Sequence, residues 1–333
     1  MIENLPKQLR KVTDKLLLKR LSDGIKQVEA SLEKAVAQTD PIADATSRHL
    51  TQAGGKRVRP TLVLLTSQFG DGISKRVIDA AVVVELTHLA TLYHDDVMDE
   101  APMRRGVPTA HKVWGNSVAI LTGDLLFARA SQVVSRLGSE ALSLQADTFE
   151  RLCLGQLHET LGPQPTDHPV DHYIQVLADK TGSLIATAAE MGIIYSGAAP
   201  EYRIAVREFG EKIGVAFQLI DDVIDLQSDG KTSGKTQGTD LLAHVDTLPT
   251  LYLRQLATTD ADASRLLAEV ESVTEETLQH VVSQLRDHEV TVRTYNEAKR
   301  WADEAIAALA PLPDGAAKQA MAAFAAAVVD RQA

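Results

Sequence analysis

Helical periodicity runs through almost the whole chain and is the feature that most limits its fold. Apolar residues recur every three to four positions, and no segment shows the clear apolar–polar alternation of a half-buried strand. The β-branched run Val82–Val84 could form a short strand, but its continuation into Glu85–Tyr93 favours a helix. The sequence therefore predicts an all-α fold. The longest helices are expected at 74–100, 117–137, 139–160, about 170–195 and about 201–226.

Gly- and Pro-containing stretches interrupt these helices, and none of them separates regions of different composition. The clearest interruptions are 53–60, 101–109, 161–169 and 227–240. Asp40 is expected to cap a helix that begins at Pro41. From Leu248 onwards the chain is again helical and ends in the Ala-rich stretch 315–328. We therefore expect one domain over 1–333, with the core motifs in 54–240 and C-terminal helices in 248–333.

Charge and cysteine content limit the partners and the compartment. A net charge of −11 argues against nucleic acid as the main partner, although phosphorylated ligands respond to local basic residues rather than to the total. The single cysteine, Cys153, rules out an intramolecular disulfide and fits a reducing compartment. The start MIENLPKQLRK has no apolar core of a secretory signal, and the apolar stretches carry too many Glu, Asp and His residues for a membrane span. A cytoplasmic protein is expected.

Two acidic triplets of identical spacing follow apolar helical turns. Asp95, Asp96 and Asp99 lie in "LYHDDVMDEA" (92–101), and the second triplet lies in "FQLIDDVIDL" (217–226) at Asp221, Asp222 and Asp225. On a helix, residues four apart share a face and adjacent residues are about 100° apart, so each triplet occupies one arc. One such triplet could be a solvated helix end. Two triplets of the same spacing make that interpretation much weaker.

A divalent cation is the natural counter-charge for these carboxylates. Carboxylates this close repel and raise one another's pKa values unless a cation lies between them. Mg²⁺ prefers carboxylate oxygen, keeps several waters and commonly bridges protein to a substrate phosphate. The triplets therefore predict a magnesium-dependent phosphate site.

Basic residues stand beside the same helix ends and predict an anion site. "GGKRVRP" (54–60) places basic side chains on a Gly-rich turn whose backbone amides can approach an anion. "MRRG" (103–106) follows the first triplet directly. Each of these residues alone could be an ordinary solvated charge. The basic candidates are Lys56, Arg57, Arg59, Arg104, Arg105, Lys180, Lys231 and Lys235.

Taken in order, these motifs resemble the trans-isoprenyl diphosphate synthases, also called polyprenyl synthases. The resemblance extends from about residue 40 to the end of the chain, and the paired aspartate motifs are highly specific. The matching elements are "GGKRVRP", His88, "HDDVMDEAPMRRG", "GNSVAILTGDLL", "KTGSLIATAAEMG", "GEKIGVAFQLIDDVIDL" and "GKTQGTDL".

The resemblance implies a role for each matching residue. Magnesium ions, more than one per active site, would grip the allylic diphosphate through Asp95, Asp96, Asp99, Asp221 and Asp222, with Asp225 as support. Residues in contact with the same diphosphate would be Arg104, Lys180 and Lys235. Isopentenyl diphosphate would bind to Lys56, Arg59, His88 and Arg105, and Thr181 and Gln218 would lie beside the reacting groups.

The resemblance also implies a fold, a reaction and an assembly. The fold would be the isoprenoid synthase fold, a helical bundle around a deep central cavity, usually a homodimer. The reaction would join isopentenyl diphosphate head-to-tail to the allylic substrate in trans, with the metal ions stabilising charge on the leaving pyrophosphate. No membrane span is expected, and a peripheral membrane contact for product release stays open.

One departure from the family pattern and several alternatives remain. The loop "DLLAHVDTLP" (240–249) places Leu242, Ala243 and Val245 where the family often has basic and acidic residues, which removes a phosphate contact. A terpene cyclase on the same fold usually has a degenerate second metal motif. A non-catalytic regulatory subunit typically lacks Asp residues of the triplets. Both triplets are complete here, so an active synthase is expected.

Small residues before the first triplet predict a long product. In this family, bulky residues four and five positions before the first Asp stop elongation early. Thr91 and Ala90 occupy these positions, and Thr87 lies one turn further back. One helical turn rises ~5.4 Å, about the length of an isoprene unit. A long-chain polyprenyl diphosphate is expected, with a geranylgeranyl or farnesyl product as the alternative, and close helix packing is the other reason for small residues here.

Overall fold

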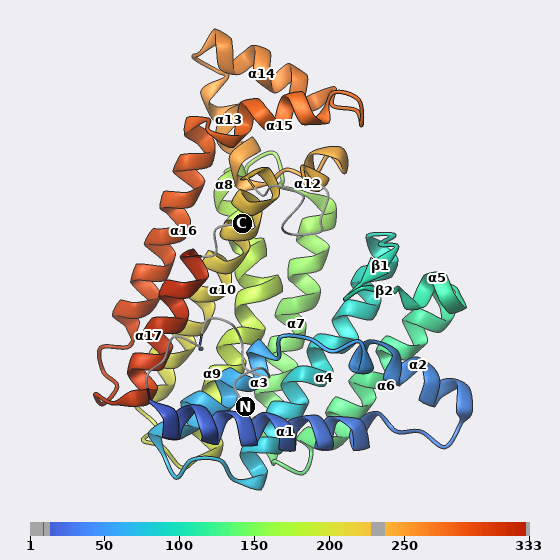
Figure 1. The fold of residues 1–333 in the computed structure, drawn as a ribbon, viewed down its shortest axis with the longest axis vertical. Coiled ribbons are helices and arrows are strands. Elements are labelled where there is room, and N and C mark those ends of the chain that lie inside the picture. The colour runs from blue at the N-terminus through green and yellow to red at the C-terminus, as the bar shows by residue number, and fades with distance from the viewer. Residues whose placement is uncertain (1–8, 10–13, 228–236, 331–333) are drawn as a thin grey trace. The chain divides into compact units, whose positions relative to one another are not determined.

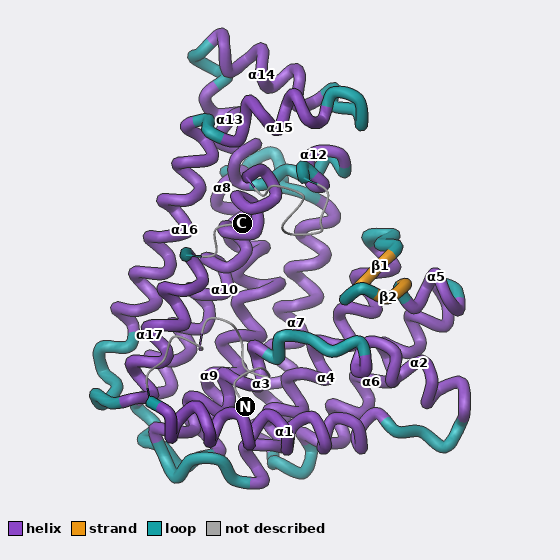
Figure 2. Tube along the Cα trace, viewed as in Figure 1, coloured by secondary structure: helices purple, strands orange, loops and turns teal. Residues whose placement is uncertain are grey.

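The computed structural model describes residues 9, 14–227 and 237–330, and regular structure within them is almost entirely helical (Figures 1 and 2). The only strands among the described residues form one two-residue pair. This confirms the predicted all-α class.

The elements in chain order are α1 (Lys15–Val36), α2 (Pro41–Gln52), α3 (Val58–Thr66), η2 (Ser67–Phe69), α4 (Lys75–Met98), β1 (Met103–Arg104), β2 (Val107–Pro108), α5 (Ala110–Trp114), α6 (Asn116–Val134), α7 (Ser139–Leu161), α8 (Pro169–Leu177), η3 (Ala178–Gly182), α9 (Ser183–Tyr195), α10 (Tyr202–Gln227), α12 (Thr239–Leu242), α13 (Leu248–Leu256), α14 (Ala261–Glu271), α15 (Leu278–Arg286), α16 (Glu289–Ala308) and α17 (Ala316–Val329).

The predicted long helices are confirmed within two or three residues at their ends, as α4, α6, α7 and α10. Val82–Val84 is helical and buried in α4. Asp40 caps α2 as expected, because its Oδ1 accepts hydrogen bonds from the backbone N–H groups of Ile42 at 3.0 Å and Ala43 at 2.9 Å. Pro41 is the first residue of that helix.

The helix expected at 170–195 contains a π turn that periodicity did not predict. α8 runs into η3, a five-residue π-helical segment, and η3 runs into α9. Single π turns inside α-helices are rare and occur frequently at functional sites. This one carries Lys180 and Thr181, both candidate site residues.

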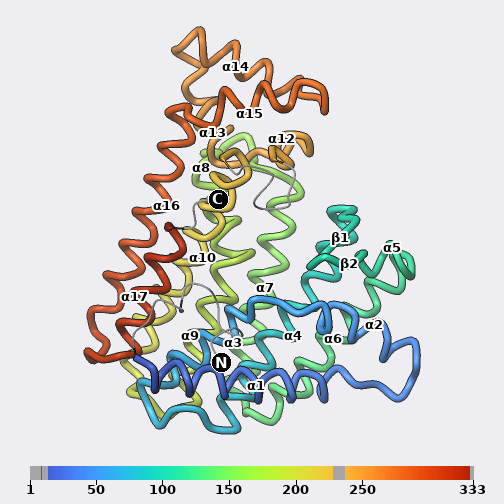
Figure 3. Tube along the Cα trace, in the orientation of Figure 1, coloured from blue at the N-terminus to red at the C-terminus, as the bar shows by residue number. Residues whose placement is uncertain are grey.

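The chain divides into two compact units, and each is assembled from separate stretches. The colours of Figure 3 give the place of each stretch along the chain. Unit 1 comprises Met1–Glu150, Leu184–Gly210 and Leu309–Ala323. Unit 2 comprises Arg151–Ser183, Glu211–Ala308 and Phe324–Ala333. The expectation of a single domain over 1–333 stays a prediction.

Unit 1 is built around α4, which packs on α1, α3 and α6. Close approach of α9 to α3 depends on Gly192, because a Cβ there would lie 2.0 Å from Oγ1 of Thr66 and 2.3 Å from the carbonyl oxygen of Val63. Arg203 adds an ion-pair link, with Nη1 2.7 Å from Glu140 and Nη2 2.9 Å from the buried Glu190.

Unit 2 is held by packing of α13 on α14 and α16 and by ion pairs between helices. Arg151 of α7 lies between two carboxylates, with Nε 2.7 Å from Asp179 and Nη1 2.7 Å from Glu211. Gly155 on the same helix allows η3 to approach, since a Cβ there would lie 2.8 Å from the backbone nitrogen of Lys180.

Among the described residues, two helices, α4 and α6, are long and apolar enough to cross a membrane by length and composition alone. The most apolar window of α4 is 72% buried inside the protein, as expected of a core helix, whereas that of α6 is 33% buried. Core helices pass the same test, so this is weak evidence for a span.

Candidate active site

The first acidic triplet lies at the end of α4 in unit 1. Asp95 and Asp96 belong to the last helical turn, and Asp99 caps the helix, with its N–H donating to the Asp95 carbonyl at 2.8 Å. Asp99 is exposed, Asp95 is half-buried and Asp96 is buried. The three carboxylates therefore differ sharply in their contact with water, which the spacing alone did not indicate.

Asp96 is paired with Arg104 through one of its two carboxylate oxygens. Oδ1 accepts from Nε of Arg104 at 2.7 Å and lies 2.6 Å from Nη2. Oδ2 is buried and has no hydrogen-bond partner within the described part of the chain. Burial raises the pKa of Asp96, and Arg104 opposes that rise. One oxygen of Asp96 is thus held by the protein, and the other is available to a ligand.

A short hairpin positions Arg104 and Arg105. β1 and β2 pair antiparallel, with Arg104 opposite Val107. The two turn residues, Arg105 and Gly106, have φ values of 54° and 80°, the backbone of a turn type whose twist matches that of the strands. Because the hairpin follows α4 directly, both arginines are carried back towards the helix end.

Arg105 rests against the Gly-rich turn that precedes α3. Its Nη1 donates to the Leu50 carbonyl at 3.0 Å and to the Gly54 carbonyl. A Cβ on Gly55 would lie 2.9 Å from the guanidinium carbon of Arg105, so only glycine permits this approach. The predicted isopentenyl-binding role of Arg105 stays a prediction.

Arg57 of the Gly-rich turn points into unit 1, where two carboxylates bind it. Its side chain is 3% exposed and forms ion pairs with Glu29 and Glu85, each at 2.6 Å. Lys56, by contrast, is exposed, and Arg59 is half-buried. Arg57 therefore does not belong with the candidate anion-binding residues, and the Gly-rich turn offers Lys56 and Arg59.

Arg59 and His88 lie in a cationic environment beside the first triplet. Burial lowers the pKa of Arg59 to about 10, with Glu85 opposing that fall, so the side chain stays charged at neutral pH. Nε of Arg59 is buried without a hydrogen-bond partner among the described residues. Burial and the neighbouring arginines hold the pKa of His88 well below its usual value, which makes its ring neutral. The arginines gathered around His88 fit an anionic ligand.

The second acidic triplet lies near the end of α10 in unit 2. Asp222 is buried, while Asp221 and Asp225 are half-buried. Oδ2 of Asp222 accepts from the Tyr173 hydroxyl at 2.8 Å and from the Leu248 backbone N–H at 3.4 Å. Burial raises the pKa of Asp222 well above its usual value, against the hydrogen bond from Tyr173. Tyr173 has no counterpart among the residues predicted from the sequence, since nothing in its sequence context indicates a contact 49 positions away.

Asp225 organises the start of α12. Its Oδ1 accepts from the Thr239 hydroxyl at 2.9 Å and the Thr239 N–H at 3.3 Å, and its Oδ2 accepts from the Asp240 N–H at 3.3 Å. These contacts agree with a supporting rather than a metal-binding part for Asp225.

The remaining candidates of unit 2 lie on η3 and α10. Lys180, on the π turn, forms an ion pair with Glu159 of α7. Thr181 and Gln218 are half-buried. Lys231 and Lys235 lie outside the described residues.

The donor chemistry of both triplets fits Mg²⁺. Carboxylate oxygen is the ligand that this ion prefers, and the buried Oδ2 of Asp96 lacks a partner among the described residues. Within the part of the chain that the structure describes, no three His, Cys, Asp or Glu side chains form a ready-made cation site. Mg²⁺ is usually bound by one or two carboxylates together with water and substrate phosphates. The triplets therefore suit ions that a diphosphate helps to hold.

The candidate length-determining residues lie on the middle turns of α4. Ala90 and Thr87 are buried, and Thr91 is half-buried. His94 faces α6, because a Cβ on Gly123 would lie 2.3 Å from its Nε2. Thr87 lies two turns before His94 and therefore on the same face. This face packs on α6, and the role of Ala90, Thr91 and Thr87 as a floor stays a prediction.

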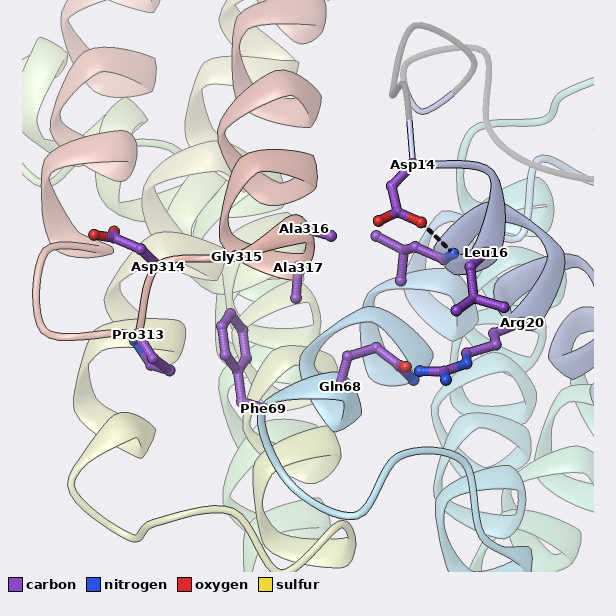
Figure 4. Close-up of a pocket in the computed structure, with 11 residues that line it drawn as sticks. Asp14, Leu16, Arg20, Gln68, Phe69, Pro313, Asp314, Gly315, Ala316 and Ala317 are labelled. Atoms are coloured by element: carbon purple, nitrogen blue, oxygen red, sulfur yellow. Dashed lines mark hydrogen bonds between the residues drawn. The ribbon is translucent and has the colours of Figure 1, made fainter.

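A hollow of about 250 Å³ in unit 1 does not belong to this site (Figure 4). Residues of α1, of η2 and of the start of α17 line it, and none of them is a predicted site residue. Asp14 at its rim is engaged as the cap of α1, accepting from the Leu17 N–H at 2.8 Å.

Comparison with known proteins confirms the resemblance and the fold. The family model described as polyprenyl synthetase matches residues 40–285. Nonaprenyl diphosphate synthase of Mycobacterium tuberculosis is 40% identical over 304 residues, which cover 90% of each chain. Heptaprenyl diphosphate synthase component 2 of Geobacillus stearothermophilus is 36% identical, over 88% of this chain and 91% of that protein. A crystal structure of geranylgeranyl pyrophosphate synthase from Corynebacterium glutamicum, complexed with calcium and isoprenyl diphosphate, superposes with a TM-score of 0.84 at 42% identity, covering 96% of this chain and 99% of that one. The chain belongs to the polyprenyl synthetase family.

Proposed function

We propose that this protein is a trans-polyprenyl diphosphate synthase, which condenses an allylic diphosphate with isopentenyl diphosphate head-to-tail. The observation that carries the proposal is the pairing of acid and base in unit 1. Asp96 keeps one buried oxygen without a partner among the described residues, and Arg59, Arg104 and Arg105 lie beside this triplet. Unit 1 therefore places carboxylates that can bind a hard cation next to arginines that can bind phosphate.

The proposed reaction breaks one C–O bond and forms one C–C bond. The allylic C–O bond breaks with its electron pair leaving on pyrophosphate, and the double bond of isopentenyl diphosphate attacks the resulting carbocation. Loss of a proton then restores an allylic diphosphate that is one unit longer. Arg104, Lys180 and Lys235 would bind the leaving diphosphate, and Lys56, Arg59, Arg105 and the neutral His88 would orient isopentenyl diphosphate.

Mg²⁺ is the proposed cofactor, with more than one ion per site. Asp95, Asp96, Asp99, Asp221 and Asp222 would hold the ions, and Asp225 would support the second triplet through its contacts with α12. When bound, the ions supply positive charge against the pyrophosphate that leaves. Thr181 and Gln218 are proposed to lie beside the reacting carbons.

A long-chain product is proposed from the residues behind the first triplet. Relatives of similar identity have names that imply different lengths, from geranylgeranyl to nonaprenyl, so the residues on α4 carry the argument. Ala90 and Thr91 leave the helix face free of bulky groups for one turn behind Asp95. A geranylgeranyl or farnesyl product is the alternative.

A homodimer is proposed because unit 1 exposes apolar side chains on neighbouring elements. Leu121 of α6 is 66% exposed, and other exposed large apolar side chains of unit 1 include Val113, Ile120, Leu142 and Phe149. Phe149 stacks on Phe127 of α6 with ring centroids 4.2 Å apart, which joins α7 to the same surface. A second copy of the chain would cover it. Light scattering should report a dimer, and Leu121→Glu should shift it towards the monomer.

Cytoplasmic localisation is proposed, with any membrane contact confined to product release. The single Cys153 fits a reducing compartment, and the predominantly buried α4 fits a core helix.

Incubation of the purified protein with isopentenyl diphosphate, an allylic primer and Mg²⁺ tests the proposal. An active synthase elongates the primer without any partner chain, and mass spectrometry of the dephosphorylated alcohols gives the length of the product. A terpene cyclase would release hydrocarbon from the primer without isopentenyl diphosphate. A regulatory subunit would form product only after a partner chain is added, and either outcome would contradict the proposal.

A further inference from the structure

Arg57 has a backbone conformation that a non-glycine residue rarely adopts. It stands at the N-cap position of α3 with φ 45° and ψ 38°, in the left-handed region. No side-chain hydrogen bond caps this helix start. Contacts made by the Arg57 side chain must therefore favour this backbone over the ordinary alternatives.

The Arg57 guanidinium is held from three sides. Nη1 donates to Oε1 of Glu85 at 2.6 Å, Nε donates to Oε1 of Glu29 at 2.6 Å, and Nη2 donates to the Thr51 carbonyl at 3.2 Å. Glu85 is 2% exposed, whereas Glu29 is 40% exposed. Glu85 also lies 3.9 Å from Nη2 of Arg105. The buried carboxylate of Glu85 thus joins the Gly-rich turn to the hairpin arginine.

Two carboxylates neutralise Arg57 and keep it away from any ligand. Its neighbours differ: Lys56 is exposed, and Arg59 has an Nε without a hydrogen-bond partner among the described residues. The left-handed residue between them turns the chain so that Arg57 faces inwards while Lys56 remains at the surface. The orientation of the two candidate binding residues, Lys56 and Arg59, therefore depends on Arg57, which does not bind the substrate itself.

We propose that Arg57, anchored by Glu85, is a positioning residue that fixes Lys56 and Arg59 in the geometry that binds the diphosphate of isopentenyl diphosphate. The inference rests on the proposed function, which assigns Lys56 and Arg59 to that substrate. Arg57 acts through the turn and makes no contact with the substrate.

Direct binding of isopentenyl diphosphate to the full-length protein tests this role without turnover. Calorimetry in EDTA, with no allylic primer present, gives the dissociation constant for the wild type, Arg57→Gly and Arg57→Lys. Arg57→Gly keeps the left-handed backbone favourable and removes every side-chain contact, so binding should weaken about tenfold or more. Arg57→Lys keeps the charge, but a single ammonium group cannot bind both carboxylates as the guanidinium does. Its affinity should therefore lie between those of Arg57→Gly and the wild type.

Steady-state kinetics separate positioning from general loss of structure. In both variants the KM for isopentenyl diphosphate should rise, while kcat at saturation and the KM for the allylic primer stay within about threefold. A purely structural role would instead lower the active fraction and leave both KM values unchanged.

Arg203 provides a matched control in the same unit. It also lies between one buried carboxylate, Glu190, and one exposed carboxylate, Glu140. Arg203→Lys should lower the melting temperature by an amount comparable to Arg57→Lys and leave the affinity for isopentenyl diphosphate unchanged.

Each outcome decides the inference. Arg57→Gly binding as tightly as the wild type would overturn it, and so would equal weakening by Arg203→Lys. Lys56→Ala and Arg59→Ala serve as separate tests of the proposed site. If these two variants bind normally, the assignment of the substrate is wrong; if they lose binding while Arg57→Gly retains it, only the positioning role is wrong.

Discussion

The two acidic triplets share one sequence pattern but bury their middle carboxylate in different ways. Asp96 in unit 1 faces a charged partner, Arg104, at 2.6–2.7 Å. Asp222 in unit 2 faces the uncharged Tyr173 hydroxyl and a backbone N–H. Burial raises the pKa of both carboxyls, and among the described residues only the rise for Asp96 is opposed by an arginine. A repeated motif therefore does not imply a repeated electrostatic environment.

This difference suggests that the two triplets depend unequally on an added cation. A buried carboxylate without a charged partner is costly, and a bound cation relieves that cost. In unit 1 Arg104 supplies part of the counter-charge, whereas in the described part of unit 2 Asp222 bonds only to a hydroxyl and a backbone N–H, so the proposed metal ions would carry more of it there. The predictions below test whether this asymmetry extends to function.

Removal of the first carboxylate of either triplet should have the largest effect. Asp95→Ala and Asp221→Ala should each lower kcat by about 10²–10³-fold, because a carboxylate that holds a metal acts mainly on the transition state. Product assays measure the loss, and circular dichroism should show unchanged helix content. Near-normal turnover in one variant would mean that its triplet does not hold an essential ion.

The basic residues should divide between the two substrates. Lys56→Ala or Arg59→Ala, in unit 1, should raise the KM for isopentenyl diphosphate by about 10–100-fold, because a charge-assisted bond to phosphate is lost. Lys180→Ala, in unit 2, should act mainly on the allylic primer. Equal effects of all three changes on both substrates would show that the two diphosphates are assigned wrongly.

Neutralising the two middle carboxylates should affect the stability of the metal-free protein unequally. In EDTA at pH 8, Asp222→Asn should raise the free energy of unfolding by about 1–3 kcal/mol, because a charge buried without a cationic partner is removed. Asp96→Asn should change it by less than about 1 kcal/mol, since the lost pair with Arg104 offsets the relief. Urea unfolding curves measure both values.

The gain from Asp222→Asn should also depend on pH in a defined direction. The folded-state pKa of Asp222 is raised above the usual 3.8, so the folded protein binds this proton more tightly than the unfolded chain. Stability is therefore lost as pH rises above about 3.8, until the folded-state pKa is passed. The advantage of Asp222→Asn should be larger at pH 8 than at pH 5, and an advantage that grows towards low pH would contradict this account.

The smallest expected effect concerns product length. It tests whether α4, rather than α10, limits the length of the product. Ala90 and Thr91 stand five and four positions before Asp95, whereas Ala216 and Phe217 stand five and four positions before Asp221. Ala90→Phe or Thr91→Phe should shorten the product by one or more isoprene units, and the alcohols can be sized by mass spectrometry. Unchanged products in the Ala90 and Thr91 variants would show that the limit lies elsewhere.

The sequence predicts the helices well because their apolar periodicity is strong and local. It also predicts both triplets and most of the basic candidates, because the residues within each motif lie close together along the chain. It does not predict the partners of Asp96 and Asp222, since these depend on how distant segments pack. Arg57 is the clearest case. In the sequence it is a basic residue like its neighbours Lys56 and Arg59, and only the contacts with Glu29 and Glu85 show that it points inwards.

The discontinuous make-up of the two units has a consequence for synthesis of the chain. The polypeptide passes from one unit to the other at residues 150, 183, 210, 308 and 323. The stretch Leu309–Ala323 completes unit 1 and contributes the fully buried Leu309, Ala320 and Met321. The ribosome therefore translates Asp95 more than 200 residues before the last part of its unit is made. For most of translation, unit 1 therefore lacks these three buried side chains, and its packing can be completed only after the C-terminal stretch has been made.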